Sequence, residues 1–513
     1  MKKRYLLLAG FVLVKFFLQY FLISPEYDLH RDEFLHLDQA HHLAWGYLSV
    51  PPVTSWISFL IYLLGNSAFW VKFFPALFGA LTIIVVWKAT EELKGNVYAL
   101  AVSATCILFS ALLATNTLYQ PNSLDVLSWT AFYYFVIRYL KTENPKWLYW
   151  AAVVFAAGFL NKYNIVFSVI GFLPAILLTS HRKVFVKRDI YIAIGIVLAL
   201  IFPNLLWQYK HNFPVFHHLN ELADTQLAHV NRLDFLKSQV LYFFGSLPVI
   251  ISAIFALLYY KPFEKYKPFF WSFILTLTVF LLFRAKGYYA MGLYPVYISY
   301  GAVFLEDILK NGWKRYVRPI LFILPVLFFM MMYSFTFPNK SPEHIVNHPE
   351  KYSKFGMLRW EDGTDHALPQ DFADMLGWKE LASKVDSIYA ELPRPDNTLI
   401  LCDNYGQAGA INYYTKNKKL TACSFHADYA DWLPSDKKIT DVVLIKQSAF
   451  DDDRDRKSEI PLFDDVYLAD RRINRYARED TISIYVLRGA KVDVTQLMHV
   501  LQGETEFMFD IQR

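Results

Sequence analysis

The sequence carries an adjacent pair of carboxylates near its start, in Arg31-Asp32-Glu33, about twenty residues before Pro51-Pro52. A carboxylate can take a proton from a hydroxyl group as that oxygen attacks, and such general-base catalysis contributes roughly 10²–10⁴-fold. A solvated loop acid, or an ion pair within Arg31-Asp32, explains the same pattern. Asp32 and Glu33 are therefore candidate catalytic residues, with the structural alternative left open.

A third acid, Asp125, lies at the start of the apolar run 123–140. An ionisable group so close to hydrocarbon is costly unless it is paired or hydrated, so it is a functional candidate by default. The alternative is a carboxylate at a helix start, where the helix dipole favours negative charge. Both interpretations of Asp125 remain open.

Cations interrupt the apolar sequence at Lys162 and again at Arg284 and Lys286, which Tyr288 and Tyr289 follow. Ammonium and guanidinium groups pair strongly with phosphate oxygens. These residues are therefore candidates for binding a phosphate. Lipid headgroup binding and snorkelling are the structural alternatives.

Histidines gather in the same early segment as the carboxylates, at His30, His36, His41 and His42. They lack a fixed metal-ligand spacing, and two adjacent histidines diverge on a helix. We predict no metal site, and structural or acceptor-contacting roles for these side chains. The sequence also shows no glycine-rich phosphate loop, which disfavours an enzyme driven by ATP or a nucleotide sugar. No cofactor is predicted.

The elements that must position these residues are mostly membrane helices. The 513-residue chain is 55% hydrophobic and only 19% charged, against about 25% charged in soluble domains. Its formal net charge of +5 comes mainly from Lys and Arg between apolar runs, which indicates membrane topology and argues against nucleic-acid binding. A bilayer core about 30 Å thick needs roughly 20 apolar residues per helix. The candidate spans are 5–24, 67–87, 97–115, 123–140, 147–160, 164–180, 190–207, 237–259, 268–283, 288–305 and 318–336.

The basic clusters all fall on one side of the membrane if the first helix starts in the cytoplasm, as the positive-inside rule requires. The first apolar run lacks a small-residue cleavage site, so we predict an uncleaved helix and not a signal peptide. The run 147–180 has basic flanks and must cross twice, with its polar break at 161–164 on the outer side. Loop 25–66 and the chain after residue 337 lie on that side too.

From residue 337 onward the composition becomes that of a soluble domain, and short apolar strands alternate with helical segments. Cys402 and Cys423 fall on two of the predicted strands, where they either form a disulfide or are simply buried. The turn Asp403–Gly406 follows the first strand, at a place where α/β domains often bind ligands. The predicted strands are 398–403, 420–424, 441–446 and 482–487, and the predicted helices are 378–390 and 408–414.

Taken in order, these segments resemble the GT-C glycosyltransferases, specifically the family-39-like bacterial enzymes related to protein O-mannosyltransferases and to the aminoarabinose transferase acting on lipid A. The likeness covers residues 1–336, and two tail segments are also similar. The order and spacing of the motifs carry the resemblance. The matching segments are Arg31-Asp32-Glu33, 42–47, Pro51-Pro52, 119–121, Leu124-Asp125, 158–163, 203–208, 286–289, 293–295, 373–378 and 404–410.

The resemblance implies an α-helical polytopic membrane protein of GT-C type. About eleven transmembrane helices would occupy residues 1–336, together with periplasmic loop 25–66, and a small soluble periplasmic α/β domain would occupy 337–513. It also implies a bacterial inner-membrane enzyme with a cytoplasmic N-terminus. This enzyme would move a hexosyl or pentosyl group from a polyprenyl-phosphate carrier to a hydroxyl acceptor, with inversion at the anomeric carbon. Its partners would be the lipid-linked donor, the acceptor (protein, lipid or glycan) and the bilayer.

Carried over by position, the family's functional residues fall into three sets. Val50 departs from the lipid A enzyme, which has a basic residue there, and Asn122 stands where many relatives have an acid, so the acceptor and part of the phosphate-binding set stay open. The implied sets are Asp32 as general base with Glu33 beside it, Lys162, Arg284, Lys286, Tyr288 and Tyr289 at the donor phosphate, and Asp125, His36 and Asn161 at the acceptor and sugar pocket.

Two other classes compete with this interpretation. An oligosaccharide ligase or polymerase would need a large basic outer loop, whereas loop 208–236 is only moderate in length. A lipid transporter or sensor would show paired broken helices in two repeats, and the sequence has no such repeat. A glycosyltransferase is therefore the favoured prediction.

Overall fold

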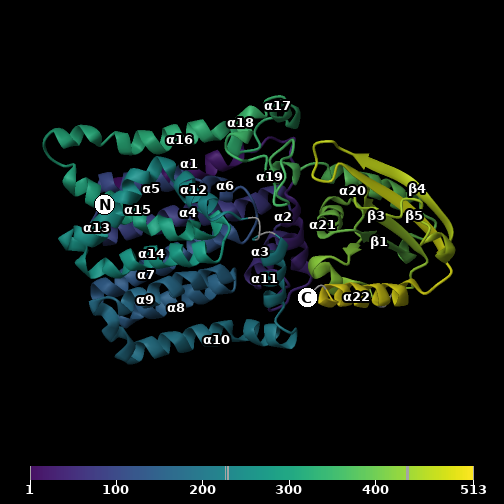
Figure 1. Ribbon diagram of the computed structural model, residues 1–513, viewed down its shortest axis with the longest axis horizontal. Helices are drawn as coiled ribbons and strands as arrows, with labels where there is room; N and C mark the ends of the chain where they lie inside the picture. Colours follow the sequence, from purple (N-terminus) through teal and green to yellow (C-terminus); the bar gives the residue numbers. More distant parts are fainter. Residues whose placement is uncertain (1, 226, 228–229, 435–437, 512–513) are drawn as a thin grey trace. The chain divides into compact units, whose positions relative to one another are not determined.

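The computed structural model describes residues 2–225, 227, 230–434 and 438–511 (Figure 1). The chain divides into two compact units that are not simply consecutive in sequence. The first unit comprises residues 1–23, 44–54 and 67–339, and the second comprises 24–43, 55–66 and 340–513. The predicted boundary at 336/337 lies close to one of these limits, but most of loop 25–66 groups with the C-terminal segment.

The first unit is helical. Its largest buried side chains are aromatic, including Trp87, Trp129 and Tyr133, so large rings fill the space between its helices. Its helices are α1 (Lys2–Phe21), α4 (Ala68–Glu92), α5 (Val97–Leu108), α6 (Leu112–Thr115), α7 (Asn122–Thr142), α8 (Pro145–Phe159), α9 (Val166–Leu177), α10 (Arg188–Lys210), α11 (Pro214–Thr225), α12 (Arg232–Tyr242), α13 (Leu247–Tyr259), α14 (Lys267–Leu282), α15 (Tyr294–Ile308) and α16 (Ile320–Thr336).

Among the described residues, four helices are long and apolar enough to cross a membrane, and the number rises to six if each of two bent helix pairs is one span. The chain is therefore a multi-pass membrane protein, as predicted. The count of eleven spans stays a prediction, because several of the predicted spans are helices of 12 to 16 residues. The four helices are Lys3–Phe21, Ala68–Glu92, Arg188–Lys210 and Gly312–Thr336.

Close packing of α13 and α15 depends on Gly301. A Cβ atom at this position would lie 1.9 Å from the carbonyl oxygen of Val249, and a backbone atom cannot rotate away. We expect Gly301→Ala to lower the free energy of unfolding by about 1–3 kcal/mol, the usual cost of overpacking. Gly195→Ala in α10 is the control, because its Cβ would meet nothing within 4 Å. Thermal denaturation in detergent would contradict the prediction if both variants melted like the wild type.

The second unit contains a mixed five-stranded sheet in the order β2-β1-β3-β5-β4. β1 (Thr398–Cys402) pairs in parallel with β2 (Ala422–Ser424) and with β3 (Asp441–Gln447). β5 (Thr481–Ala490) pairs antiparallel with β3 and with β4 (Phe463–Ile473). The small α/β domain predicted from the tail is therefore present.

Both faces of the central strands are covered. Leu399 and Val442 pack with Met498 of α22 on one face, whereas Ile400 and Val443 point to the other face and are buried. Cys402 and Cys423 are buried free thiols on neighbouring strands, so the buried alternative holds and no disulfide joins them. The helices of this unit are α2 (Arg31–Asp38), most of α3 (Val53–Leu63), α17 (Pro342–Val346), α18 (Glu350–Ser353), α19 (Gln370–Ala373), α20 (Trp378–Glu391), α21 (Tyr405–Tyr414) and α22 (Val494–Ile511).

Candidate functional site

The candidate catalytic pair lies in the first turn of α2. His30 is the N-cap residue: its ring accepts a hydrogen bond from the backbone N–H of Asp32 at 3.2 Å. The Glu33 carboxylate accepts the backbone N–H of His30 at 2.8 Å and completes a capping box. Glu33 is fully buried. Its structural role is therefore to fix the start of the helix that presents Asp32.

The Asp32 side chain keeps 38% of its surface exposed, so a solvent-borne hydroxyl group can reach it. The hydroxyl group of Tyr405 donates a hydrogen bond to Asp32 Oδ1 at 2.7 Å. Burial acts to raise the pKa of Asp32, but the charges of His30 and Arg31 and the Tyr405 hydrogen bond outweigh it and hold the pKa below its usual value. Asp32 is therefore a carboxylate at neutral pH, as a proton acceptor must be.

His36, predicted to line the acceptor pocket, is a buried residue of α2. Its ring Nδ1 lies 3.4 Å from Oε1 of Gln39, and its carbonyl accepts a hydrogen bond from the Ser58 hydroxyl group at 2.5 Å. Burial lowers the pKa of His36 despite the opposing charge of Asp32. These contacts hold α2 against the segment after residue 55.

The predicted polar break between α8 and the next helix is present. α8 ends at Phe159, and the 3₁₀ turn Tyr163–Ile165 leads into α9. The backbone N–H of Lys162 bonds to the Gly158 carbonyl at 2.8 Å. Asn161 is buried and donates its amide to the Pro121 carbonyl at 2.9 Å. Asn161 thus anchors the break to the segment before α7.

The Lys162 ammonium group is held between a side-chain oxygen and two aromatic rings. It donates to Asn122 Oδ1 at 2.6 Å and lies 5.2 Å and 4.7 Å from the ring centroids of Tyr288 and Tyr289. Burial lowers the pKa of Lys162 to about 8, with nearby Lys286 acting in the same direction and Asp125 against it. The group is therefore mainly a cation at neutral pH, in surroundings that strengthen its pull on an anion.

Asp125 is buried in the first turn of α7 and is hydrogen-bonded on both oxygens. Trp129 Nε1 donates to Oδ1 at 3.2 Å, and the Asn164 amide donates to Oδ2 at 2.8 Å. The same amide also bonds to the carbonyl of Tyr289 at 2.9 Å. Asn164 therefore joins three segments, and it is absent from the predicted site residues. Its place in the polar break was visible in the sequence, but an uncharged amide gave no chemical signal.

Arg284 and Lys286 precede the 3₁₀ turn Gly287–Leu293, which supplies the two tyrosines. Arg284 has a backbone φ of 51° and an exposed side chain, and no ion pair to its guanidinium is present among the described residues. Lys286 is partly buried and acts electrostatically on Lys162. The structure thus groups Lys286 with Lys162 and leaves Arg284 at the surface.

The predicted site residues form two groups in different units. The Lys162 group belongs to the first unit and is defined as Asn122, Asp125, Lys162, Asn164, Lys286, Tyr288 and Tyr289. The Asp32 group, defined as His30, Arg31, Asp32, Glu33 and Tyr405, belongs to the second. The described residues contain no cluster of three or more potential metal ligands. One group is suited to hold an anion and the other to accept a proton.

The family described as dolichyl-phosphate-mannose-protein mannosyltransferase matches residues 49–207. The lipid A galacturonosyltransferase RgtD from Rhizobium johnstonii is 24% identical over 217 residues, which are 40% of this chain and 45% of that protein. The chain thus aligns with less than half the length of this curated relative.

Crystal structures of ArnT from Cupriavidus metallidurans share the fold. The apo structure gives a TM-score of 0.59 at 12% identity and covers 94% of this chain and 97% of that one. The structure bound to undecaprenyl phosphate gives a TM-score of 0.57 at 11% identity with the same coverage.

Together, the fold and the matched family segment confirm the predicted resemblance to the GT-C glycosyltransferases. The two relatives that the chain is similar to are a lipid A galacturonosyltransferase and ArnT.

Proposed function

We propose that this protein is a membrane glycosyltransferase that moves a sugar from a polyprenyl-phosphate carrier to a hydroxyl acceptor, with inversion at the anomeric carbon. The observation that carries the proposal is the Lys162 cation, which lies in the matched segment 49–207. Asn122 of the same segment and the rings of Tyr288 and Tyr289 hold it. A relative in the same fold was crystallised with undecaprenyl phosphate. A lipid-linked phosphate is therefore the anion we assign to this group.

In the reaction we propose, the acceptor oxygen forms a bond to the anomeric carbon while the bond from that carbon to the phosphate oxygen breaks. The electron pair of the broken bond stays on the phosphate, so negative charge grows there in the transition state. In the first unit, the ammonium groups of Lys162 and Lys286 stabilise this charge. Electrostatic stabilisation of the transition state is usually the largest single contribution to catalysis. The Tyr288 and Tyr289 rings fix the position of the ammonium group.

The proton of the acceptor hydroxyl passes to Asp32 in the same proposal. Asp32 is ionised, partly exposed and fixed by the capping box of α2, which are the properties a general base needs. Glu33 acts by holding that helix start. Asp125, Asn161 and His36 keep the supporting roles that their buried hydrogen bonds indicate.

The test uses the two donors that the relatives' names suggest, undecaprenyl phosphate carrying mannose or galacturonic acid. Membranes with the full-length protein should convert at least one of them to free undecaprenyl phosphate, whereas membranes with Asp32→Asn should not. Failure with both donors, in the presence of total lipid and protein extracts of the host, would contradict the proposed donor class.

The acceptor and the location belong to the same proposal. We place the reaction at the periplasmic face of the bacterial inner membrane, with either a lipid or a protein as the acceptor. Mass spectrometry of lipids and glycoproteins from a deletion strain, compared with a strain carrying Asp32→Asn, identifies the acceptor as the species missing from both. A species that is lost in the deletion but retained with Asp32→Asn would contradict the assigned role of Asp32.

A further inference from the structure

Tyr405 lies 373 residues after Asp32 in the sequence, yet its hydroxyl group reaches that carboxylate at 2.7 Å. Tyr405 is the first residue of α21. The side chain of the N-cap residue Asn404 accepts the backbone N–H groups of Gly406 and Gln407, the two residues after Tyr405. The position of the Tyr405 backbone is thus set by the start of its helix.

Glu479, which lies two residues before β5, holds this helix start. Its two carboxylate oxygens accept the amides of Asn404 and Gln407 at 2.9 and 2.7 Å. Glu479 is 3% exposed, so these hydrogen bonds are shielded from water. The first turn of α21 is therefore rigidly tied to the sheet.

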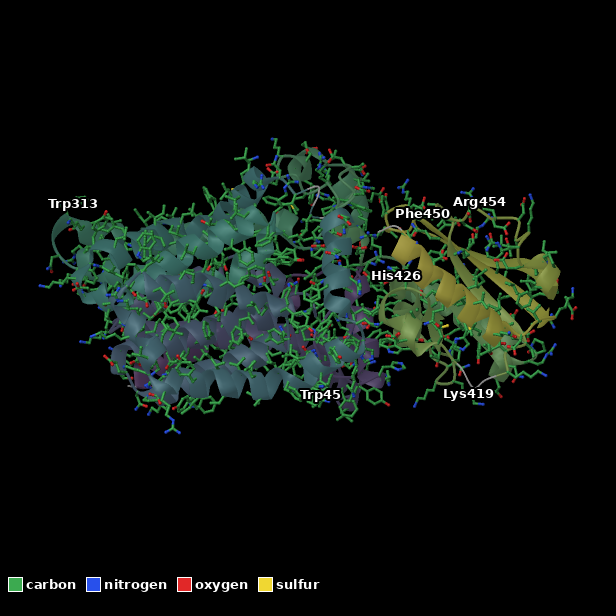
Figure 2. All side chains as sticks on the ribbon, turned by 60° about the horizontal axis from the view of Figure 1, so that its bottom comes forward. Trp45, Trp313, Lys419, His426, Phe450 and Arg454 are labelled. Carbon is green, nitrogen blue, oxygen red and sulfur yellow. The ribbon has the colours of Figure 1, made fainter. Side chains whose placement is uncertain are left out.

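The Tyr405 ring is fixed by two partners. The Arg31 guanidinium group lies 4.6 Å from the ring centroid, and the His426 ring stacks on Tyr405 with centroids 5.3 Å apart and planes at 17°. His426, which Figure 2 labels, follows β2. Burial lowers the pKa of His426 to about 4, with Arg31 acting in the same direction, so the stacked imidazole is neutral. The hydroxyl group therefore points in one direction.

The helices themselves approach closely. A Cβ atom at Gly409 of α21 would lie 2.6 Å from Cβ of Phe34 in α2, so a glycine is needed at this crossing. The crossing brings the first turn of α21 to the first turn of α2. Burial raises the pKa of the Tyr405 hydroxyl, which therefore keeps its proton and acts toward Asp32 as a donor.

We infer that Tyr405 is a positioning residue for the proton acceptor of the transfer reaction: it orients the Asp32 carboxylate through a direct hydrogen bond from the C-terminal domain. This inference rests on the proposed function, in which Asp32 is the general base. It gives the C-terminal segment of the second unit, residues 340–513, a role in the reaction chemistry in addition to its structural role.

The hydrogen bond has a predictable effect on the pH dependence of turnover. It stabilises the carboxylate, so its removal raises the pKa of Asp32. A general base works only when ionised, and activity is lost as the pH falls through its pKa. The acid limb of the rate profile should therefore move to higher pH in Tyr405→Phe. The other charged or titratable groups that act on Asp32 or on its neighbour Arg31 are His30, Arg31, His36, Asp371, Asp374, His426 and Glu479.

The experiment compares Tyr405→Phe with Tyr414→Phe in the full-length protein. Tyr414 is the matched control because it lies on the same helix, and its hydroxyl group accepts the backbone N–H of Leu29 at 3.2 Å. Both variants lose one hydrogen bond to the same N-terminal segment, but only one loses the bond to Asp32. The readout is release of undecaprenyl phosphate from the mannosyl or galacturonosyl donor as a function of pH, with melting temperatures measured in parallel.

We expect Tyr405→Phe to lower kcat about tenfold and to move the acid limb upward by about one pH unit, with little change in the KM for the donor. Tyr414→Phe should leave the limb in place. An unmoved limb in Tyr405→Phe, or an equal shift in both variants, would overturn the inference. The Asp32→Asn variant distinguishes failure of the positioning role from failure of the proposed function. If it is inactive while the acid limb of Tyr405→Phe is unmoved, only the positioning role of Tyr405 fails. If Asp32→Asn retains full turnover, the general base itself is wrong.

Discussion

Replacement of Asp32 by asparagine is expected to abolish nearly all sugar transfer while leaving the protein folded. The amide has the shape of the carboxylate and can still accept the Tyr405 hydroxyl hydrogen bond, but it cannot take a proton. The loss should be roughly 10²–10⁴-fold in kcat, the usual contribution of general-base catalysis. Donor consumption by purified protein measures turnover, and binding of the labelled donor shows whether the affinity for the donor is preserved.

Asp38→Asn is the matched control for this variant. Asp38 is the last residue of the same helix, and its carboxylate accepts hydrogen bonds from Asn412 and Tyr429. Burial raises the pKa of Asp38 to about 6, which suits a structural acid. A fall in melting temperature with turnover largely intact is expected. Comparable loss of turnover in both variants would refute the special role of Asp32.

Removal of the Lys162 ammonium group in Lys162→Ala is expected to reduce turnover by roughly 10²–10³-fold, because it removes a fixed cation from the departing phosphate. The loss should appear in both donor binding and kcat, since the phosphate is charged before and during transfer. Lys146→Ala is the control: its ammonium group also lies over an aromatic ring, 4.6 Å from the Trp147 centroid, but outside the Lys162 group. Equal activity in the two variants would refute the assignment.

The same lysine predicts an alkaline limb in donor binding. The pKa of Lys162 is lowered to about 8 mainly by burial, so the cation is present below that pH and is lost as the pH rises through it. Donor KM should therefore increase above about pH 8 in the wild type. Lys162→Arg keeps its charge at all accessible pH values and should lack this limb, although its planar group fits the tyrosine pair differently.

The sequence indicates the charged candidate residues of the site but not the neutral residues that position them. Adjacent acids and an isolated lysine stand out in an apolar chain, so the sequence singles out Asp32 and Lys162 as candidates. Two neutral supporting residues were not found: Tyr405, which donates to Asp32, and Asn164, which donates to Asp125. Both are chemically ordinary residues whose role depends on a tertiary neighbour. Tyr405 lay in a turn singled out as a possible ligand site, but nothing in the sequence could pair it with an acid 373 residues away.

The fold shows the same division. β1 and β3 were predicted within a residue or two because their apolar runs are buried on both faces. β4 was missed because it is a mostly exposed edge strand in which polar and apolar residues do not alternate regularly, and it pairs through its backbone with β5. α7 contains charged residues, among them Asp125 and Arg138, which make its sequence less apolar than that of an ordinary membrane span. The helix predicted at 123–140 is nevertheless present.

The crossing of α2 and α21 has a consequence for biosynthesis. Residues 31–38 leave the ribosome early, whereas the surface they pack against is made only when residues 405–414 follow. Until then Phe34, which is fully buried in the finished protein, has no place to pack. A chain interrupted before residue 405 would thus lack the Tyr405 hydrogen bond to the proposed proton acceptor Asp32, so membrane insertion alone would not yield the proposed sugar transfer.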